Sequence, residues 1–347
     1  MPHPSGPEAA AATRILVTGA GGYVGTVLVP ELLAAGYAVR ALDRFFFGAD
    51  LLAPHPRLQL VPADTRLLEP GHLEGVGAVV DLAALSNDPS GERFCDATWA
   101  INRAARVRCA RLAKAASVAR YVLPSSCCVY GFRADGAICD EDGAPNPLTT
   151  YAAANLRAEA EILPLAGDGF CVTVLRQATL FGPSPRMRFD LAINGMTWGA
   201  WSTGVLPLMR DGTQWRPLLH VRDAASAIRF VLEQPAERVN GRVLNVGPRD
   251  GNVRLADLAA RVAGALPRPA RIEWYGDPDA RSYRVAFDRI AALGWEARHG
   301  IEGAVAEMAA LLDAGRLDRT PRTITLDWYE ALERRYGALS DPTAAFG

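Results

Sequence analysis

Three glycines at three-residue intervals stand between an aliphatic run and a longer amphipathic segment near the start of the chain. Gly19, Gly22 and Gly25 follow residues 14–18, RILVT, and introduce residues 23–35. This order predicts a strand, a tight turn and a helix. The first glycine permits the tight turn, the second lets a bound phosphate group approach the backbone, and the third allows the helix to pack closely on the strand. Because the first amides of a helix attract anions, the turn predicts a site for the pyrophosphate of a dinucleotide.

Short aliphatic runs then alternate with helical segments along the first half of the chain, which predicts a parallel sheet with helices on both faces. We therefore expect an α/β, Rossmann-like, doubly wound sheet with a smaller C-terminal α/β lobe that binds the substrate. After Gly182 the chain is broken by proline and glycine into shorter pieces. The expected organisation is a disordered leader over 1–13, a dinucleotide-binding domain over 14–182 with some later elements returning to it, and the lobe over 183–347. Predicted strands lie at 14–18, 38–43, 58–61, 78–82, 121–124 and 171–176 and, after residue 183, at 205–209, 243–246 and 272–274. Predicted helices lie at 23–35, 94–116, 151–163, 222–233, 254–265 and 301–314.

Composition narrows the class of protein. The 347 residues carry 37 basic and 38 acidic side chains, a net charge of −1, so no positive field favours nucleic acid. No apolar stretch approaches the roughly 20 residues that span a bilayer, and the leader lacks the features of a signal peptide. Six cysteines without CxxC spacing and five scattered histidines indicate neither a disulfide framework nor a metal site. We expect a cytoplasmic protein that binds neither nucleic acid nor membrane.

The end of the second predicted strand indicates which dinucleotide is bound. Asp43 follows the glycine turn by about 20 residues, where a carboxylate accepts hydrogen bonds from the adenosine ribose. This favours NAD. Arg44 comes next in the sequence and could instead meet a 2′-phosphate, which leaves NADP as the alternative. Asp64, after the third strand, could reach the adenine or cap a turn.

Two further motifs complete the pattern: residues 125–131, SSCCVYG, and Tyr151. Together with the GxxGxxG spacing they resemble the extended short-chain dehydrogenase/reductase family, specifically its nucleotide-sugar epimerases, dehydratases and reductases. The resemblance covers residues 14 to 315. It includes residues 81–84, DLAA, after the fourth strand, Asn102 in the long helix, and residues 181–183, FGP, before the second lobe.

The resemblance implies roles for individual residues. Tyr151 would be the acid/base, Ser126 would bond the reacting oxygen, and a nucleoside-diphosphate sugar would be the substrate, its diphosphate held by Arg216 and Arg281. Homodimers that form through a four-helix contact are common in the family, so a homodimer is expected, and residues 94–116 and 151–163 could supply the contact. The implied cofactor contacts are Gly19, Gly22, Tyr23, Val24, Gly25, Asp43, Arg44, Asp64, Thr65, Leu82, Ala83, Ala84, Asn102, Tyr151 and Asn155, and the implied substrate contacts are Ser86, Thr179, Arg216 and Arg281.

One position departs from the family pattern. Where the family has a lysine four residues after the tyrosine, this chain has Asn155. Asparagine can bond a ribose hydroxyl but brings no charge, so the pKa of Tyr151 should stay nearer to its usual value of about 10. Arg157 points to another face of the helix and is not expected to replace the ammonium. A neutral phenol can still donate a proton to an alkoxide, so ketone reduction should survive the change better than alcohol oxidation.

Cys128 stands where some related epimerases carry a catalytic cysteine. Its thiol could act as an acid or base, or could simply pack at the end of a strand. Residues 127–128 cannot supply the Asp-Glu pair of 4,6-dehydratases, which disfavours that reaction. We therefore expect a 4-ketoreductase or an epimerase of a nucleoside-diphosphate sugar. The alternatives are a catalytically weakened member that binds the dinucleotide for a non-redox or regulatory role, and an enzyme for a non-nucleotide substrate.

Overall fold

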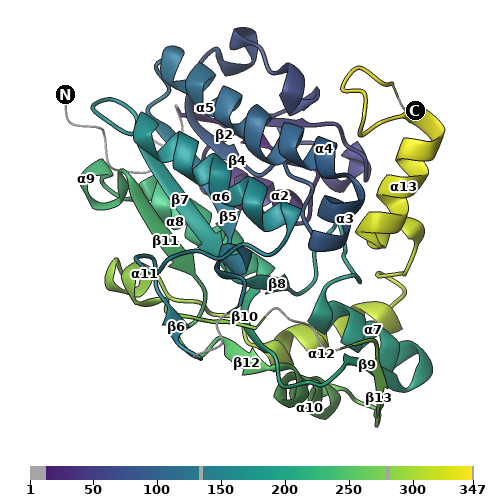
Figure 1. Cartoon of the computed structure of the whole chain (residues 1–347). Coiled ribbons are helices and arrows are strands. Elements are labelled where there is room, and N and C mark those ends of the chain that lie inside the picture. The colour runs from purple at the N-terminus through teal and green to yellow at the C-terminus, as the bar shows by residue number, and fades with distance from the viewer. Residues whose placement is uncertain (1–12, 133–135, 278–281, 346–347) are drawn as a thin grey trace.

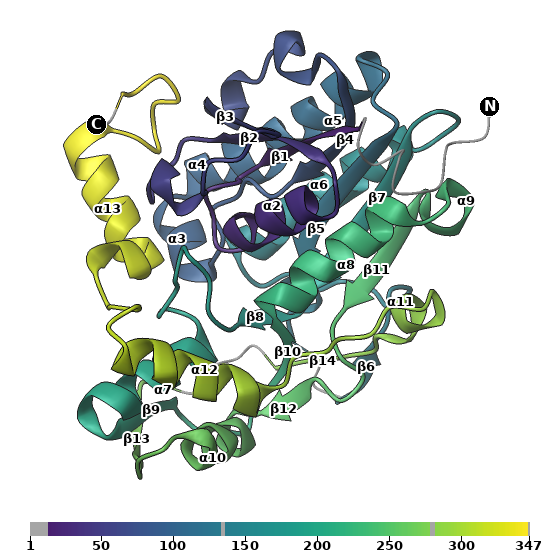
Figure 2. The same cartoon turned by 180° about the vertical axis from the view of Figure 1, so that it is seen from behind.

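The alternation of aliphatic runs and helices produces one central sheet of seven parallel strands in the order β11-β7-β5-β4-β1-β2-β3 (Figures 1 and 2). The computed structural model describes residues 13–132, 136–277 and 282–345. The predicted α/β parallel sheet is confirmed. Its strands are β1 Arg14–Thr18, β2 Ala38–Asp43, β3 Leu58–Pro62, β4 Val76–Asp81, β5 Arg120–Ser126, β7 Cys171–Gln177 and β11 Arg242–Val246.

Helices cover both faces of this sheet, because alternate residues of each central strand point to opposite sides. Ile15 and Val17 of β1 pack with α2 (Gly25–Ala34) and α8 (Val221–Glu233). Leu16 packs on the other side with α5 (Arg106–Ala115) and α6 (Thr150–Ile162). Strands β1 to β3 extend the sheet to one side, and β4, β5, β7 and β11 extend it to the other, so the strand order reverses between β1 and β4. Ligands of such folds bind at this point, beyond the carboxyl ends of the strands.

The segment predicted as one helix over 94–116 has three parts. Helix α4 (Cys95–Thr98) leads into a π-helical stretch, η4 (Trp99–Ala105), and then into α5. The π-helical stretch carries Asn102, which is fully buried; its side chain bonds the backbone N–H and C=O of Leu85 at 2.9 and 3.0 Å. Asn102 therefore fixes the loop that follows β4.

A second hydrophobic cluster lies beside the carboxyl edge of the sheet. Helices α7 (Ala192–Thr203), α10 (Leu255–Ala265) and α12 (Ile301–Asp313) surround the parallel pair β9 (Val205–Met209) and β13 (Arg271–Tyr275). The remaining elements are α3 Asp88–Arg93, α9 Ala236–Val239, α11 Asp288–Ala292, β6 Ile138–Cys139, β8 Thr179–Phe181, β10 Trp215–His220, β12 Asn252–Arg254 and β14 Arg284–Val285.

The last helix, α13 (Thr325–Tyr336), leaves the second cluster and returns to the first part of the chain, beside α3 (Figures 1 and 2). Tyr329 and Leu332 of α13 pack against Phe46 and Phe47, which follow β2. This helix was not predicted. The C-terminal segment therefore lies at the carboxyl end of the sheet, where the site is expected.

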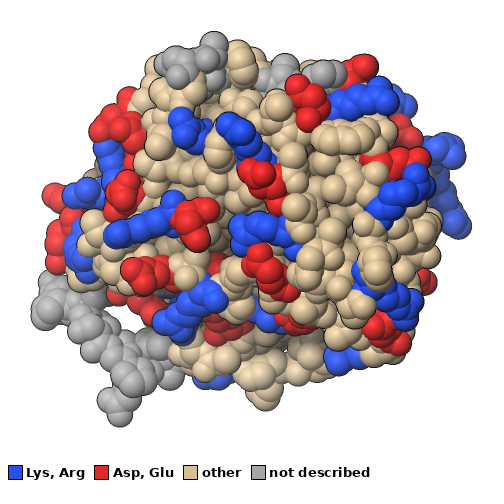
Figure 3. Space-filling view, turned by 90° about the horizontal axis from the view of Figure 1, so that it is seen from below, with Lys and Arg blue, Asp and Glu red and all other residues tan. Residues whose placement is uncertain are grey.

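Charges of both signs are interspersed over the face in Figure 3, without a large area of one sign. Among the described residues, every helix is too short or too polar to cross a bilayer. In the same part of the chain no three His, Cys, Asp or Glu side chains gather in an arrangement suited to a metal ion.

Candidate active site

A cavity of about 490 Å³ opens at the carboxyl edge of the sheet, between the glycine turn and the second hydrophobic cluster. It gathers residues from the whole length of the chain, from Gly19 to Leu339. Most of the sequence-predicted site residues line it: Gly19, Gly22, Tyr23, Val24, Gly25, Asp43, Arg44, Asp64, Thr65, Leu82, Ala83, Ala84, Ser86, Ser126, Cys128, Tyr151, Thr179 and Arg216.

The glycine turn forms a cradle that side chains would fill. Gly19 has φ of 67°, and a Cβ there would lie 2.7 Å from the backbone of Leu82 and Ala83. A Cβ on Gly25 would lie 2.5 Å from the carbonyl oxygens of Gly19 and Ala20. Both positions therefore require glycine, and the N-terminus of α2 faces the cavity. This geometry fits a dinucleotide pyrophosphate.

Asp43 lies at the end of β2 beside this turn. Its carboxylate accepts hydrogen bonds from the backbone N–H of Gly21 at 3.0 Å and of Phe45 at 2.6 Å. Burial raises the pKa of Asp43 to about 6, although the two backbone donors act in the opposite direction. The carboxylate is thus held in place at the wall of the cavity.

The guanidinium of Arg44 is engaged in a polar network with Asp64 and the C-terminal segment. Its Nη1 lies 3.2 Å from Asp64 and donates to the carbonyl oxygens of Ala338 at 2.6 Å and Asp341 at 3.1 Å. Asp64 also accepts from the backbone N–H of Arg66 and so caps the following turn. With its guanidinium engaged in this way, Arg44 favours NAD over NADP.

The C-terminal segment lines the end of the cavity that contains Asp43, the expected adenosine end, and this was not predicted. Tyr329 and Leu339 line the cavity, and Arg66 donates to the carbonyl oxygen of Leu339 at 2.6 Å. The spacing of Thr325, Tyr329 and Leu332, all buried, is helical and was the available signal for α13. No local signal pointed to its position over the site.

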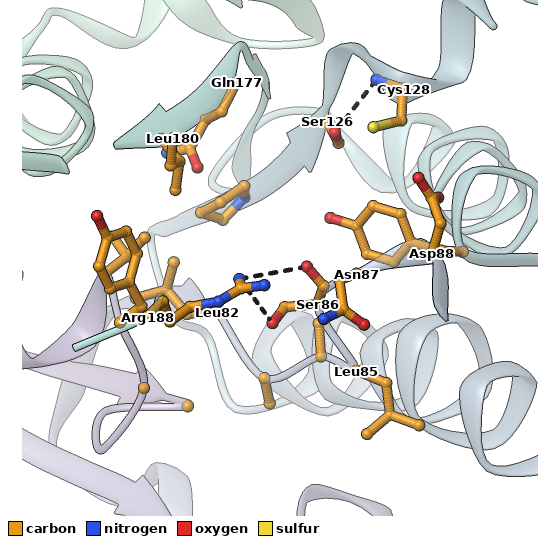
Figure 4. A pocket seen from close by; sticks show the side chains of 18 of the residues that line it. Leu82, Leu85, Ser86, Asn87, Asp88, Ser126, Cys128, Gln177, Leu180 and Arg188 are labelled. Atoms are coloured by element: carbon orange, nitrogen blue, oxygen red, sulfur yellow. Dashed lines mark hydrogen bonds between the residues drawn. The ribbon is translucent and has the colours of Figure 1, made fainter. Parts of the chain in front are cut away.

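Two buried arginines after β8 also line the cavity and were not predicted. Arg186 stacks on Phe47 at 3.7 Å, and its Nη1 is buried without a hydrogen-bond partner among the described residues. Arg188 forms a two-pronged ion pair with Asp190 and reaches across to the side-chain oxygen of Ser86 at 3.3 Å (Figure 4). Burial and the neighbouring Arg188 lower the pKa of Arg186 to about 10, so it stays cationic at neutral pH.

Ser126 and Tyr151 both line the cavity. Ser126 ends β5 and accepts a hydrogen bond from the backbone N–H of Cys128 at 3.1 Å, as Figure 4 shows. Tyr151 lies in the first turn of α6, after the cap Thr149, and lines the same cavity. Burial, with a smaller contribution from Cys128, raises the pKa of Tyr151 to about 12. At neutral pH the phenol is therefore protonated.

Asn155 does not line the cavity, contrary to the expected direct contact with the cofactor. Its side chain is 1% exposed; Nδ2 donates to the carbonyl oxygen of Tyr151 at 2.9 Å, and Oδ1 accepts from Arg106 at 2.6 Å. Arg106, which was not predicted, does line the cavity. Asn102 is also absent from the lining, because its side chain is used to hold the loop at Leu85. Arg157 lies on the outer face of α6 and pairs with Glu161.

The opposite end of the cavity brings together Thr179, Arg216 and Tyr283. The Tyr283 hydroxyl lies 3.7 Å from the sulfur of Cys128, so a second phenol faces the thiol. Arg216 lies on β10 and donates to the carbonyl oxygen of Trp215 at 2.9 Å. Arg281 and the leader residues 1–12 lie outside the described residues.

A parallel α/β sheet, a glycine cradle with an acidic residue after β2, and a Ser-Tyr pair together define a dinucleotide-dependent oxidoreductase site. Residues 15–247, about two thirds of the chain, match the NAD dependent epimerase/dehydratase family. The chain belongs to this family, and its cofactor is NAD.

The chain is similar to several characterised relatives. It is 27% identical over 322 residues to the UDP-glucose 4-epimerase of Corynebacterium glutamicum, covering 82% of this chain and 91% of that protein. It is 29% identical over 317 residues to a 3-diazoavenalumate denitrifying reductase of a Streptomyces species, covering 82% and 96%. Among solved structures, MoeE5 in complex with UDP-glucose and NAD superposes with a TM-score of 0.75 at 29% identity, covering 87% of this chain and 99% of that chain.

Proposed function

We propose that this protein is an NAD-dependent enzyme for a nucleoside-diphosphate sugar, acting at a carbinol or ketone carbon as a 4-ketoreductase or an epimerase. The observation that carries the proposal is that one cavity is lined by the glycine cradle, by Ser126 and Tyr151, and by Arg216. A sugar between them would have its reacting oxygen beside two hydroxyl groups and its diphosphate toward a guanidinium, which suits phosphate. The similarity to MoeE5, solved with UDP-glucose and NAD, supports this substrate class.

Hydride exchange with the reacting carbon is the chemistry that a bound nicotinamide would supply. In the reductive direction Tyr151 would give its phenolic proton to the oxygen of the ketone, which becomes an alcohol. Ser126 hydrogen bonds the same oxygen and stabilises the developing alkoxide. In the oxidative direction Tyr151 must first be ionised to accept the hydroxyl proton, and its raised pKa makes that form scarce at neutral pH. The site therefore favours ketone reduction.

Cys128 is the proposed additional acid/base for an epimerisation beside a ketone. Its thiol lines the cavity and lies close to the Tyr283 hydroxyl, so a proton removed by one group can be supplied by the other. A Cys128→Ser variant should lose epimer formation and keep ketone reduction. Equal loss of both activities would assign Cys128 to binding or packing.

The first experiment separates the proposed substrate from the alternatives. Purified protein is incubated with NADH and 4-keto-6-deoxy nucleotide sugars, and separately with NAD and UDP-glucose. Cofactor absorbance and chromatography report redox turnover and epimer formation. Tyr151→Phe should lower kcat about 100-fold or more, because it removes the proton donor. Absence of turnover and of epimer formation with every nucleotide would contradict the proposal.

Arg216→Ala tests the nucleotide itself. Loss of a charge-assisted hydrogen bond should raise KM for the nucleotide sugar about 10- to 100-fold, with a smaller effect on kcat. Arg222→Ala is the matched control, because Arg222 lies outside the cavity lining and pairs with Glu307. The control should behave as wild type.

A second candidate is a reductase for a non-nucleotide substrate. The similarity to the 3-diazoavenalumate denitrifying reductase supports it, since the match covers 96% of that protein. In this case Arg216→Ala would leave activity nearly intact, while Tyr151→Phe would still abolish it.

A homodimer through α5 and α6 is also proposed from the family resemblance. Light scattering on the purified protein tests it, and a monomer at micromolar concentration would contradict it.

A further inference from the structure

The family lysine is replaced, but the structure has another cation close to its expected position. Arg106 begins α5, the helix that neighbours α6, and its side chain reaches the wall of the cavity. It is 3% exposed. Its Nε donates to the carbonyl oxygen of Ala83 at 3.1 Å and its Nη1 to Oδ1 of Asn155 at 2.6 Å.

Arg106 is not placed as a buried arginine that stabilises a fold through an ion pair would be. Its two hydrogen-bond acceptors are neutral, and no carboxylate lies within ion-pair distance of it among the described residues. Removing a permanent charge from water without an opposite charge is costly, so buried arginines are normally paired. Glu159 of α6 and Arg176 of β7, both buried, show the usual arrangement. An unpaired buried cation at a cavity wall is more readily explained by the group that it faces.

Tyr151 lines the same cavity as Arg106, and Asn155 hydrogen bonds to both residues. Three charged or titratable side chains from different elements affect the pKa of the Tyr151 phenol: Cys128 from the turn after β5, Asp88 from α3 and Arg106 from α5. Cys128 and Asp88 raise the pKa of Tyr151, whereas Arg106 lowers it. Among these groups, Arg106 is the one that stabilises the tyrosinate.

Asn155 connects the two residues. Its amide donates to the Tyr151 carbonyl, one helical turn back, while its oxygen accepts from the Arg106 guanidinium. A lysine at 155 would place a second cation against Arg106, whereas asparagine supplies a neutral acceptor there. The asparagine is therefore matched to the arginine.

We propose that Arg106, oriented by Asn155, supplies the positive charge that supports proton transfer by Tyr151, so that the pair takes the place of the family lysine. Arg106 acts through Tyr151 and is a positioning residue. The inference rests on the proposed function for its consequence in catalysis, but its effect on Tyr151 is measurable without any substrate.

Three variants test the proposal by activity. Arg106→Gln removes the charge and keeps a hydrogen-bond donor toward Asn155. In a plot of kcat/KM against pH, the ionisation of Tyr151 appears as one limb. Arg106→Gln should move this limb to higher pH by about 1 pH unit or more. In the oxidative direction, at a pH below that limb, the rate should fall about 10-fold for each pH unit by which the limb moves. Arg106→Lys should retain most of the wild-type profile, because it keeps the charge.

The double variant Arg106→Gln/Asn155→Lys moves the cation to the other helix. It should restore the position of the limb, whereas a merely structural Arg106 could not be rescued in this way. Arg157→Gln is the matched control, since Arg157 is an arginine on α6 that points outward. The control should not move the limb.

A second readout needs neither substrate nor turnover. Tyrosines are replaced biosynthetically by a fluorinated tyrosine, whose phenol titrates at lower pH, and the fluorine resonance of residue 151 is identified by its absence from Tyr151→Phe. Arg106→Gln should raise the titration midpoint of this resonance by about 1 pH unit or more. An unchanged midpoint in folded protein overturns the proposal. A raised midpoint in a protein without nucleotide-sugar turnover leaves the role of Arg106 intact and overturns only the proposed substrate.

Discussion

Glu159→Gln should destabilise the protein severely, because it breaks a buried ion pair next to the catalytic strand. Arg176 of β7 contacts Glu159 of α6 with Nη2–Oε2 and Nε–Oε2 distances of 2.7 and 3.0 Å, and the two side chains are 6% and 2% exposed. Ser125, which precedes Ser126 in β5, also donates to Glu159. The pair therefore links α6, β5 and β7 beneath the active site.

The expected magnitude follows from the burial of the pair. Removing the negative partner leaves the Arg176 guanidinium uncompensated in the interior, which costs about 3–5 kcal/mol of unfolding free energy. Its remaining contact with the Tyr130 hydroxyl, at 3.0 Å, offsets a small part of this loss. Glutamine keeps the shape of glutamate and can still accept from Ser125, so the loss reports the charge.

Glu161→Gln is the matched control. Glu161 lies on the same helix, 20% exposed, and pairs with Arg103 and Arg157, which are 39% and 62% exposed. A solvent-exposed pair of this kind contributes about 0–1 kcal/mol. Both variants change one glutamate of α6 to glutamine, and they differ in how deeply the lost charge is buried.

Urea denaturation followed by circular dichroism measures the two variants and a third, Glu159→Met/Arg176→Met. Because the double variant leaves neither charge of this pair in the interior, it should be more stable than Glu159→Gln. The reasoning is refuted if Glu159→Gln costs no more than Glu161→Gln, or if the double variant is less stable than the single one.

Three further changes address the cofactor site. Gly25→Ala should abolish NAD binding, because the Cβ of the alanine would lie 2.5 Å from the carbonyl oxygens of Gly19 and Ala20. Calorimetry measures the binding, and a near-normal affinity would mean that the turn does not hold the pyrophosphate. NAD affinity should decline as the pH falls below about 6, where the Asp43 carboxylate becomes protonated, and Asp43→Asn should bind about 10-fold more weakly with a flat pH dependence. Tyr329→Ala should accelerate NAD release in stopped-flow displacement, since it opens the wall at the adenosine end, and an unchanged release rate would remove α13 from the site.

Local patterns predicted the central sheet and the glycine turn because both are determined by neighbours in sequence. The ranges of β1, β2 and β9 agree with the predictions at 14–18, 38–43 and 205–209. Helix α7 was missed because Gly195 and Gly199 looked like breaks in the chain. Both lie inside the helix, where a Cβ would lie 2.8 Å from the Phe189 carbonyl oxygen and 2.7 Å from that of Val205, so they allow close packing.

The parts of the site that escaped sequence reasoning depend on contacts between distant segments. Arg106 lies 49 residues before Asn155, and Arg44 lies 294 residues before Ala338. No periodicity links such pairs, and an arginine in a helix is ordinarily a solvated side chain. The replacement of the lysine was visible in the sequence, but the compensating arginine required the packing of α5 on α6.

The return of the C-terminal segment has a consequence for the order in which the site can be assembled. A ribosome completes the glycine turn and residues 43–66 early, yet their carbonyl partners at 338–344 and the packing partner Tyr329 are made roughly 270 to 300 residues later. Until then Arg44, Arg66 and the two phenylalanines 46 and 47 lack the contacts that the C-terminal segment supplies. The adenosine end of the site is thus finished last, so a nascent chain can form the cradle but cannot close the wall around a bound nucleotide.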